Sequence, residues 1–77
     1  MKVIIYSTPI CPYCHLAKKY LQEKNIDFEE IDVSSDPNAQ EMILEKTGEL
    51  AVPVIEIDGK FIKGFDKLQI DEILGLN

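Results

Sequence analysis

The only two cysteines of the sequence lie three positions apart, as Cys11 and Cys14, with Pro12 and Tyr13 between them. Two thiols at this spacing can form and break a disulfide, or they can contribute to a metal site. A short apolar segment precedes them and an amphipathic segment follows them, which predicts a strand and then a helix. In that context we expect Cys11 and Cys14 to form a redox-active disulfide and to carry out thiol-disulfide exchange.

The two cysteines are predicted to have different roles, because Pro12 favours the first position of a helix. Cys11 is then the N-cap residue, and its sulfur can accept hydrogen bonds from the unpaired N–H groups of the first turn. These bonds, together with the positive end of the helix dipole, stabilise a thiolate. We therefore expect Cys11 to be the nucleophile of the exchange reaction.

A helical wheel separates the side chains of the predicted helix, residues 12–24. The apolar side carries residues at helical spacing, namely Tyr13, Leu16, Ala17, Tyr20 and Leu21. Cys11 falls on the polar side with His15 and Lys18, whereas Cys14 lies at the margin of the apolar side. Cys14 is thus predicted to be the shielded, resolving thiol. His15 is either a solvent-exposed helix residue or a support for the thiolate.

Composition limits the classes of function. The 77 residues predict one domain, residues 1–77, and the apolar content of 45% is typical of a globular protein. A net charge of −6 without any arginine argues against nucleic-acid binding. No apolar run reaches the length of a signal-peptide core or a membrane span. We therefore expect a cytoplasmic monomer, in which a cysteine pair at this spacing is redox-active or binds metal.

The first part of the chain predicts a strand–helix–strand unit. Residues 2–6 contain four consecutive apolar residues, which indicates a central strand covered on both faces. Residues 26–33 predict the second strand, and the adjacent acids Glu29 and Glu30 indicate that it lies at the edge of the sheet. A crossover of this kind joins parallel strands and is almost always right-handed.

The second part of the chain predicts a helix and then a hairpin. Asp36-Pro37 is typical of a helix start, and Gly48 is typical of its end. Asp58-Gly59 is a preferred pair for a type I′ turn, so residues 54–57 and 60–63 are predicted to form a β-hairpin.

A last helix is predicted to begin after Asp66 and to end at Gly75. The complete order is βαβ-α-ββα. We expect an α/β fold with a four-stranded mixed sheet that is flanked by helices.

Three motifs of the chain carry a family resemblance: Cys11-Pro12-Tyr13-Cys14, Ala51-Val52-Pro53 and Gly64-Phe65-Asp66. With them the chain resembles the glutaredoxins over essentially its whole length. The resemblance implies a thioredoxin fold and a thiol-disulfide oxidoreductase that reduces protein disulfides or glutathione mixed disulfides. It also implies that Cys11 is the nucleophile, that Cys14 resolves the mixed disulfide, and that a cis Val52–Pro53 bond faces them.

The resemblance further implies a binding site for the substrate or for glutathione, formed by Tyr13, Val52, Pro53, Gly64, Phe65 and Asp66. Unpaired N–H groups at the start of the last helix suit the γ-glutamyl carboxylate of glutathione. The Asp66 side chain suits the glutathione amine and can also cap the helix. Glutathione is then the reductant, and no tightly bound cofactor is implied.

Some positions depart from the usual glutaredoxin pattern. Thr8 and Leu50 stand where many glutaredoxins have cationic residues, and Lys63 replaces the first glycine of a Gly-Gly pair. Pro9, Leu50 and Gly64-Phe65 also resemble the glutaredoxin-like electron donors of ribonucleotide reductase, which are reduced by thioredoxin reductase. The expected partners are therefore glutathione, thioredoxin reductase, or both, and disulfide-containing proteins such as ribonucleotide reductase.

Two other interpretations of the cysteine pair stay open. Cys11 to His15 match the attachment pattern of a c-type haem, although the strand before Cys11 favours disulfide exchange. The pair can also bind metal, as in an iron–sulfur cluster held between two chains. Zinc sites need four ligands, and only Cys11, Cys14 and His15 are close in sequence.

Overall fold

The computed structural model describes residues 2–75. In chain order, its elements are β1 (Val3–Ser7), α1 (Pro12–Glu23), β2 (Glu29–Asp32), η1 (Val33–Ser35), α2 (Pro37–Thr47), β3 (Val54–Ile57), β4 (Lys60–Lys63) and α3 (Lys67–Leu74). This order agrees with the predicted βαβ-α-ββα pattern. None of the helices in the described range has the length and apolar character needed to cross a membrane.

The four strands form one mixed sheet in the order β2-β1-β3-β4. β1 pairs in parallel with β2 and antiparallel with β3, and β3 pairs antiparallel with β4. All five residues of β1 are buried, as the apolar run predicted for a central strand. β2 lies at the edge, where the charged side chains of Glu29 and Glu30 reach solvent.

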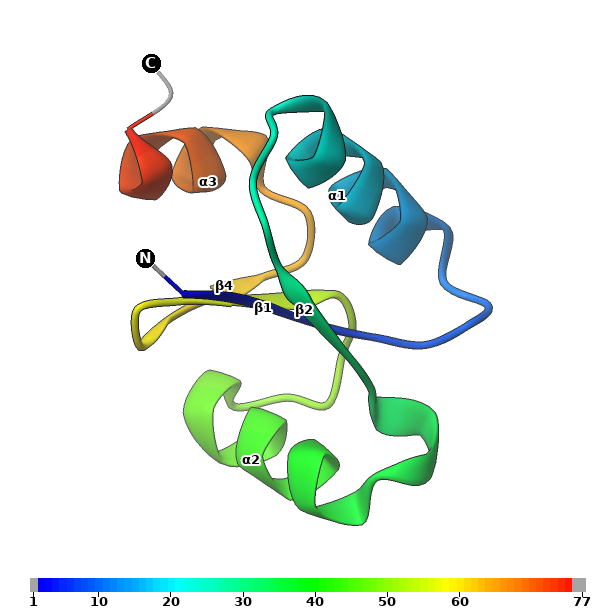
Figure 1. The fold of residues 1–77 in the computed structure, drawn as a ribbon. Coiled ribbons are helices and arrows are strands. Elements are labelled where there is room, and N and C mark those ends of the chain that lie inside the picture. The colour runs from blue at the N-terminus through cyan, green and yellow to red at the C-terminus, as the bar shows by residue number, and fades with distance from the viewer. Residues whose placement is uncertain (1, 76–77) are drawn as a thin grey trace.

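Helices cover both faces of the sheet, with α1 and α3 on one face and α2 on the other (Figure 1). Side chains that alternate along β1 divide the core into two clusters. The cluster under α1 and α3 contains Val3, Ile5, Ala17, Leu21, Ile55, Ile57, Ile62 and Ile70. The cluster over α2 contains Ile4, Tyr6, Val33, Ala39, Ile43 and Val54.

Local backbone features confirm the predicted helix and hairpin ends. The Asp36 side chain accepts a hydrogen bond from the backbone N–H of Ala39 at 3.1 Å, as an N-cap residue does. α2 ends at Gly48 with a φ of 84°. Asp58 and Gly59 have φ values of 49° and 87°, as both central residues of a type I′ turn require.

The second predicted strand is shorter in the structure than in the sequence analysis. β2 begins at Glu29 rather than at residue 26, and Ile26 and Phe28 pack against the core from the preceding loop. The strand ends where the Asp32 side chain accepts the backbone N–H of Ser34 and starts the 3₁₀ turn η1, which was not predicted. Both differences arise because side-chain burial and capping compete with strand pairing at an exposed edge.

Candidate active site

The chain leaves β1 at Ser7 and reaches Cys11 through a short loop, so the sheet positions the cysteine pair at one end of α1. Cys11 is the N-cap residue, as predicted, and has extended backbone angles. Its sulfur accepts a hydrogen bond from the backbone N–H of Cys14 at 3.2 Å. The backbone N–H of Cys11 donates to the Thr8 carbonyl oxygen at 3.4 Å, which holds the loop against the helix start.

The two thiols have different environments. Cys11 is partly exposed, whereas Cys14 is completely buried. Burial, followed by the hydrogen bond to Cys11, raises the pKa of the Cys14 thiol to about 11. At neutral pH Cys14 is therefore a protonated, shielded thiol, in agreement with the predicted difference between the two cysteines.

The helical wheel was wrong for two residues near the start of α1. Tyr13 and Leu16, which were predicted on the apolar side, are 64% and 49% exposed. α1 packs on the sheet through Cys14, Ala17 and Leu21 instead. The buried side is thus rotated toward Cys14, because tertiary packing selects which side of an amphipathic helix meets the sheet.

We expect alkylation to distinguish the thiols of the reduced protein. At slightly acid pH, iodoacetamide should label Cys11 before Cys14, because Cys14 is buried and its pKa is about 11. Mass spectrometry of peptides from a time course measures both rates. Labelling of Cys14 first, in a protein whose circular dichroism is unchanged, would contradict this assignment.

The second motif lies directly beside Cys11. The Val52–Pro53 bond is cis, as the resemblance implied. The Cys11 thiol points to the Val52 carbonyl oxygen at 3.9 Å, a long contact that marks neighbouring groups. The backbone N–H of Gly64 donates to the Pro53 carbonyl oxygen at 2.8 Å. The structure therefore brings Cys11, Val52, Pro53 and Gly64 together from three separate parts of the chain.

The other three residues of the predicted binding site, Tyr13, Phe65 and Asp66, are either exposed or engaged with other parts of the protein. The Phe65 ring packs against Tyr20, with ring centroids 5.8 Å apart, so it belongs partly to the core. Asp66 caps α3 by accepting a hydrogen bond from the Gln69 N–H at 3.2 Å. Tyr13 stands exposed on the first turn of α1. Within residues 2–75, none of these three side chains forms a hydrogen bond with Cys11.

A charged network next to Cys14 was missed by the sequence analysis. Lys18 donates to the Glu30 carboxylate at 2.7 Å, and the buried Ser7 hydroxyl donates to the same oxygen at 2.8 Å. Both bonds hold the pKa of Glu30 below its usual value. The positive charge of Lys18 partly opposes the rise in the pKa of Cys14. The spacing of Cys14 and Lys18, four residues on one helix, could have indicated that Lys18 lies near Cys14, but not that it pairs with Glu30.

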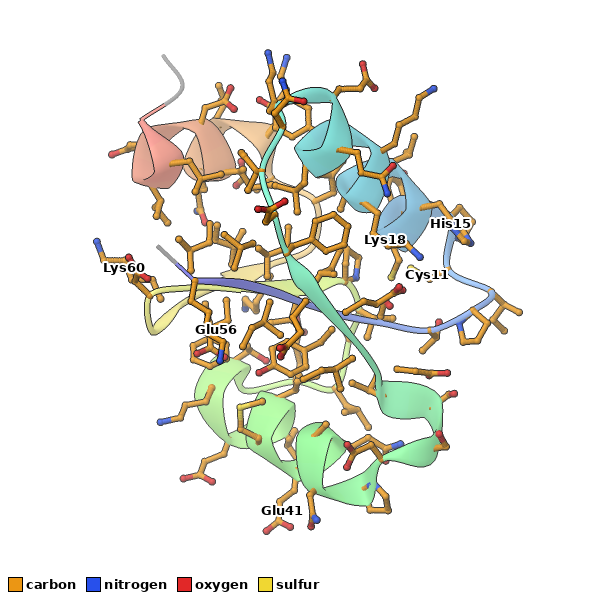
Figure 2. The ribbon with its side chains drawn as sticks, viewed as in Figure 1. Cys11, His15, Lys18, Glu41, Glu56 and Lys60 are labelled. Atoms are coloured by element: carbon orange, nitrogen blue, oxygen red, sulfur yellow. The ribbon has the colours of Figure 1, made fainter. Side chains whose placement is uncertain are left out.

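His15 lies at the same end of α1 as Cys11 and Lys18 (Figure 2). It is exposed, which agrees with the first of its two interpretations, and its Nε2 is 3.3 Å from the Pro9 carbonyl oxygen. Within residues 2–75, no group of three or more His, Cys, Asp or Glu side chains is placed to hold a metal ion.

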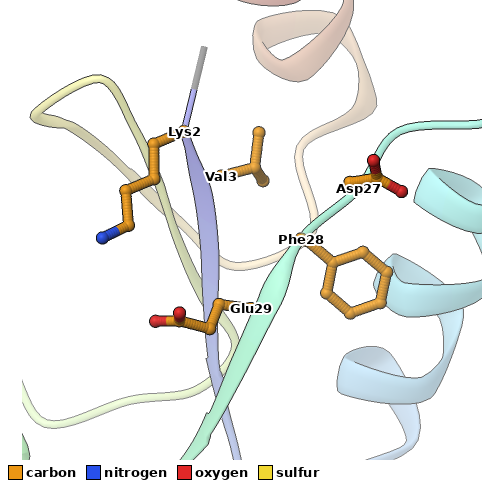
Figure 3. A pocket seen from close by; sticks show the side chains of 5 residues that line it. All are labelled: Lys2, Val3, Asp27, Phe28 and Glu29. Atoms are coloured by element: carbon orange, nitrogen blue, oxygen red, sulfur yellow. The ribbon is translucent and has the colours of Figure 1, made fainter.

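A surface hollow lies at the beginning of β1 (Figure 3). It is lined by Lys2, Val3, Asp27, Phe28 and Glu29. None of these residues was predicted to belong to the site. The end of β1 that leads to Cys11 is the opposite end of the strand, so this hollow is separate from the candidate active site.

Comparison with known proteins identifies the family. Residues 3–62 match the family model named Glutaredoxin. The chain belongs to the glutaredoxin family. It is 46% identical over 70 residues to a glutaredoxin-like 8.6 kDa protein of the rubredoxin operon of Clostridium pasteurianum, covering 91% of this chain and 93% of that protein. It is 38% identical over 66 residues to Glutaredoxin 3 of Escherichia coli K12, covering 86% and 80%.

Among solved structures, the chain is similar to the glutaredoxin-like protein NrdH-redoxin of Escherichia coli. The TM-score is 0.84 at 30% identity, with 95% of each chain covered. That protein is described as having a thioredoxin-like activity profile. These comparisons confirm the thioredoxin fold that the motifs implied. The chain is a thiol-disulfide oxidoreductase of the glutaredoxin family.

Proposed function

We propose that Cys11 and Cys14 reduce disulfides of proteins and mixed disulfides of glutathione in the reducing environment of the cytoplasm. The Cys11 thiolate attacks one sulfur of the substrate disulfide and releases the other sulfur as a thiolate, which takes up a proton from solvent. Cys14 then loses its proton, attacks the Cys11 sulfur and releases the second substrate thiol. The substrate gains two electrons and two protons, and the chain is left with a Cys11–Cys14 disulfide.

The observation that carries this proposal is the position of Cys11 as a partly exposed N-cap whose sulfur accepts the Cys14 N–H. A helix N-terminus and a backbone donor both favour the thiolate, which is the attacking species. The burial of Cys14 suits a thiol that reacts only with its neighbour. Both thiols belong to one chain, so a monomer suffices.

We propose that the substrate lies extended along the segment that contains the cis proline. Pro53 has no backbone N–H, and Val52 contacts Cys11, so an extended peptide with its cysteine at Cys11 can pair with the Val52 backbone. Gly64 supports this segment through Pro53. For glutathione, we assign the γ-glutamyl end to the start of α3 at Phe65 and Asp66, with Tyr13 flanking the tripeptide.

We also propose that thioredoxin reductase reduces the oxidised protein better than glutathione does. The support is the lack of cations at Thr8 and Leu50, together with the similarity to a protein that has a thioredoxin-like activity profile. In the test, one sample of the oxidised protein receives glutathione and glutathione reductase, and another receives thioredoxin reductase alone. NADPH consumption is compared between the two samples. A faster rate with glutathione would contradict this choice of reductant. A ribonucleotide reductase disulfide is a suitable protein substrate for the assay.

The Thr8→Lys variant is expected to use glutathione mixed disulfides better. The introduced lysine can donate a charge-assisted hydrogen bond to the glycyl carboxylate of glutathione. At a partly exposed position such a bond contributes about 1.5 kcal/mol, which is about tenfold in kcat/KM. The measurement is the reduction of a glutathionylated peptide. Gln22→Lys, which adds the same charge to an exposed position late in α1, is the control and should leave kcat/KM unchanged. Equal kcat/KM for Thr8→Lys and the unmodified protein would contradict the proposed deficit.

A further inference from the structure

A second hollow, of about 190 Å³, lies beside Cys11 and is lined by Thr8, Val33, Ser34, Gln40, Leu50 and Val52. Two of its lining residues contact Cys11 directly. The Thr8 carbonyl oxygen accepts the Cys11 N–H at 3.4 Å, and the Val52 carbonyl oxygen is 3.9 Å from the Cys11 sulfur. A group that enters this hollow is therefore next to the Cys11 sulfur, which is the proposed nucleophile.

Two polar side chains that line this hollow, Ser34 and Gln40, already have hydrogen-bond partners within the protein. The backbone N–H and the hydroxyl of Ser34 both donate to one Asp32 carboxylate oxygen, at 2.9 and 2.6 Å. The Gln40 side-chain amide donates to the Val33 carbonyl oxygen. A bound carboxylate needs donors, and to use those of Ser34 or Gln40 it would have to compete with these bonds.

The charges around the hollow also disfavour a carboxylate. The bonds from Ser34 hold the pKa of Asp32 below its usual value, so Asp32 is negative at neutral pH. Glu49 adjoins Leu50 in the chain, and the Lys63 ammonium lies 3.8 Å from the Glu49 carboxylate. No lysine lines the hollow. What it does offer is the aliphatic surface of Val33, Leu50 and Val52.

We infer that this hollow is a subsite for one aliphatic side chain of a peptide substrate, from a residue adjacent to the reacting cysteine, and that it selects against a carboxylate there. Apolar cavities of about 150 Å³ hold a benzene-sized group, so the volume accommodates a leucine side chain. Leu50, which is 57% exposed, would become covered by that side chain. The inference rests on the proposed function, since it concerns the substrate of the same cysteine pair.

The test uses blocked tripeptides that carry a chromogenic thiol as a mixed disulfide on their cysteine. One series is Gly-Cys-X and the other is X-Cys-Gly, with leucine, glycine or aspartate at X. In one series we expect leucine to exceed aspartate in kcat/KM by about tenfold, with glycine between them. Equal values for the three residues in both series would overturn the inference.

A positive charge introduced into the hollow provides the second measurement. Leu50→Lys should remove the preference for leucine and raise kcat/KM for the aspartate peptide. Leu44→Lys is the matched control, because Leu44 is an exposed leucine of α2 that does not line the hollow. Identical peptide preferences of the two variants would also overturn the inference. A protein that reduces none of the peptides refutes the proposed function, whereas one that reduces all of them equally refutes only the subsite.

Discussion

The Cys11→Ser variant is expected to lose both protein-disulfide reduction and glutathione mixed-disulfide reduction, by about a thousandfold or more. A serine hydroxyl is not ionised at neutral pH and cannot form the mixed disulfide on which both reactions depend. The measurements are turbidity from insulin reduction and the reduction of a glutathionylated peptide. Either activity persisting within about tenfold of the unmodified protein would exclude Cys11 as the nucleophile.

The fold of this variant should be preserved, which makes the activity result interpretable. Serine is one of the preferred N-cap residues, so its hydroxyl can replace the Cys11 sulfur as acceptor of the Cys14 N–H. The melting temperature should therefore stay within a few degrees of that of the unmodified protein. Circular dichroism of both proteins during a thermal scan checks this expectation.

Removal of the Cys14 thiol is expected to slow protein-disulfide reduction more than it slows removal of glutathione from a mixed disulfide. In Cys14→Ser, reduction of protein disulfides should fall by about a hundredfold or more, because the neighbouring thiol no longer resolves the mixed disulfide within the molecule. Removal of glutathione from a mixed disulfide should fall by less, since a second glutathione from solution can resolve the intermediate. Both rates are measured with the assays used for Cys11→Ser.

The buried position of Cys14 requires a second variant as a control. A serine hydroxyl at a fully buried position can destabilise the fold, whereas Cys14→Ala keeps the site apolar. Both variants should show the same separation of the two activities. If both are folded and neither retains any glutathione-linked activity, Cys14 has a role beyond resolving the mixed disulfide.

Local sequence determined the helix starts and the hairpin turn. Cys11 with Pro12, Asp36 with Pro37, and Asp58 with Gly59 all have the predicted backbone roles. These features depend on a few consecutive residues whose own φ preferences and short side-chain bonds outweigh distant contacts. For the same reason, the N-cap position of Cys11 was predictable from the helix start alone.

The orientation of α1 depended on packing that the local pattern does not contain. Tyr13, Leu16 and Cys14 are all compatible with an apolar side, and their periodicity gives only its approximate direction. Contact with the sheet then buried Cys14 and left the two larger side chains exposed. The ion pair of Lys18 and Glu30 likewise needs β2 beside α1, so the separate sequence positions did not indicate it.

The sequence by itself determined the order of the elements, the position of the cysteine pair at a helix start and, through its motifs, the family. The resemblance implied that Val52–Pro53 faces the cysteines, but only the tertiary structure shows the contact: the Val52 carbonyl oxygen, 41 residues away in sequence, lies 3.9 Å from the Cys11 sulfur. Thr8, Ser34 and Leu50 line one hollow because β1, η1 and the loop before β3 meet at the same end of the sheet. Such contacts depend on strand order and register, which are properties of the whole chain rather than of any segment.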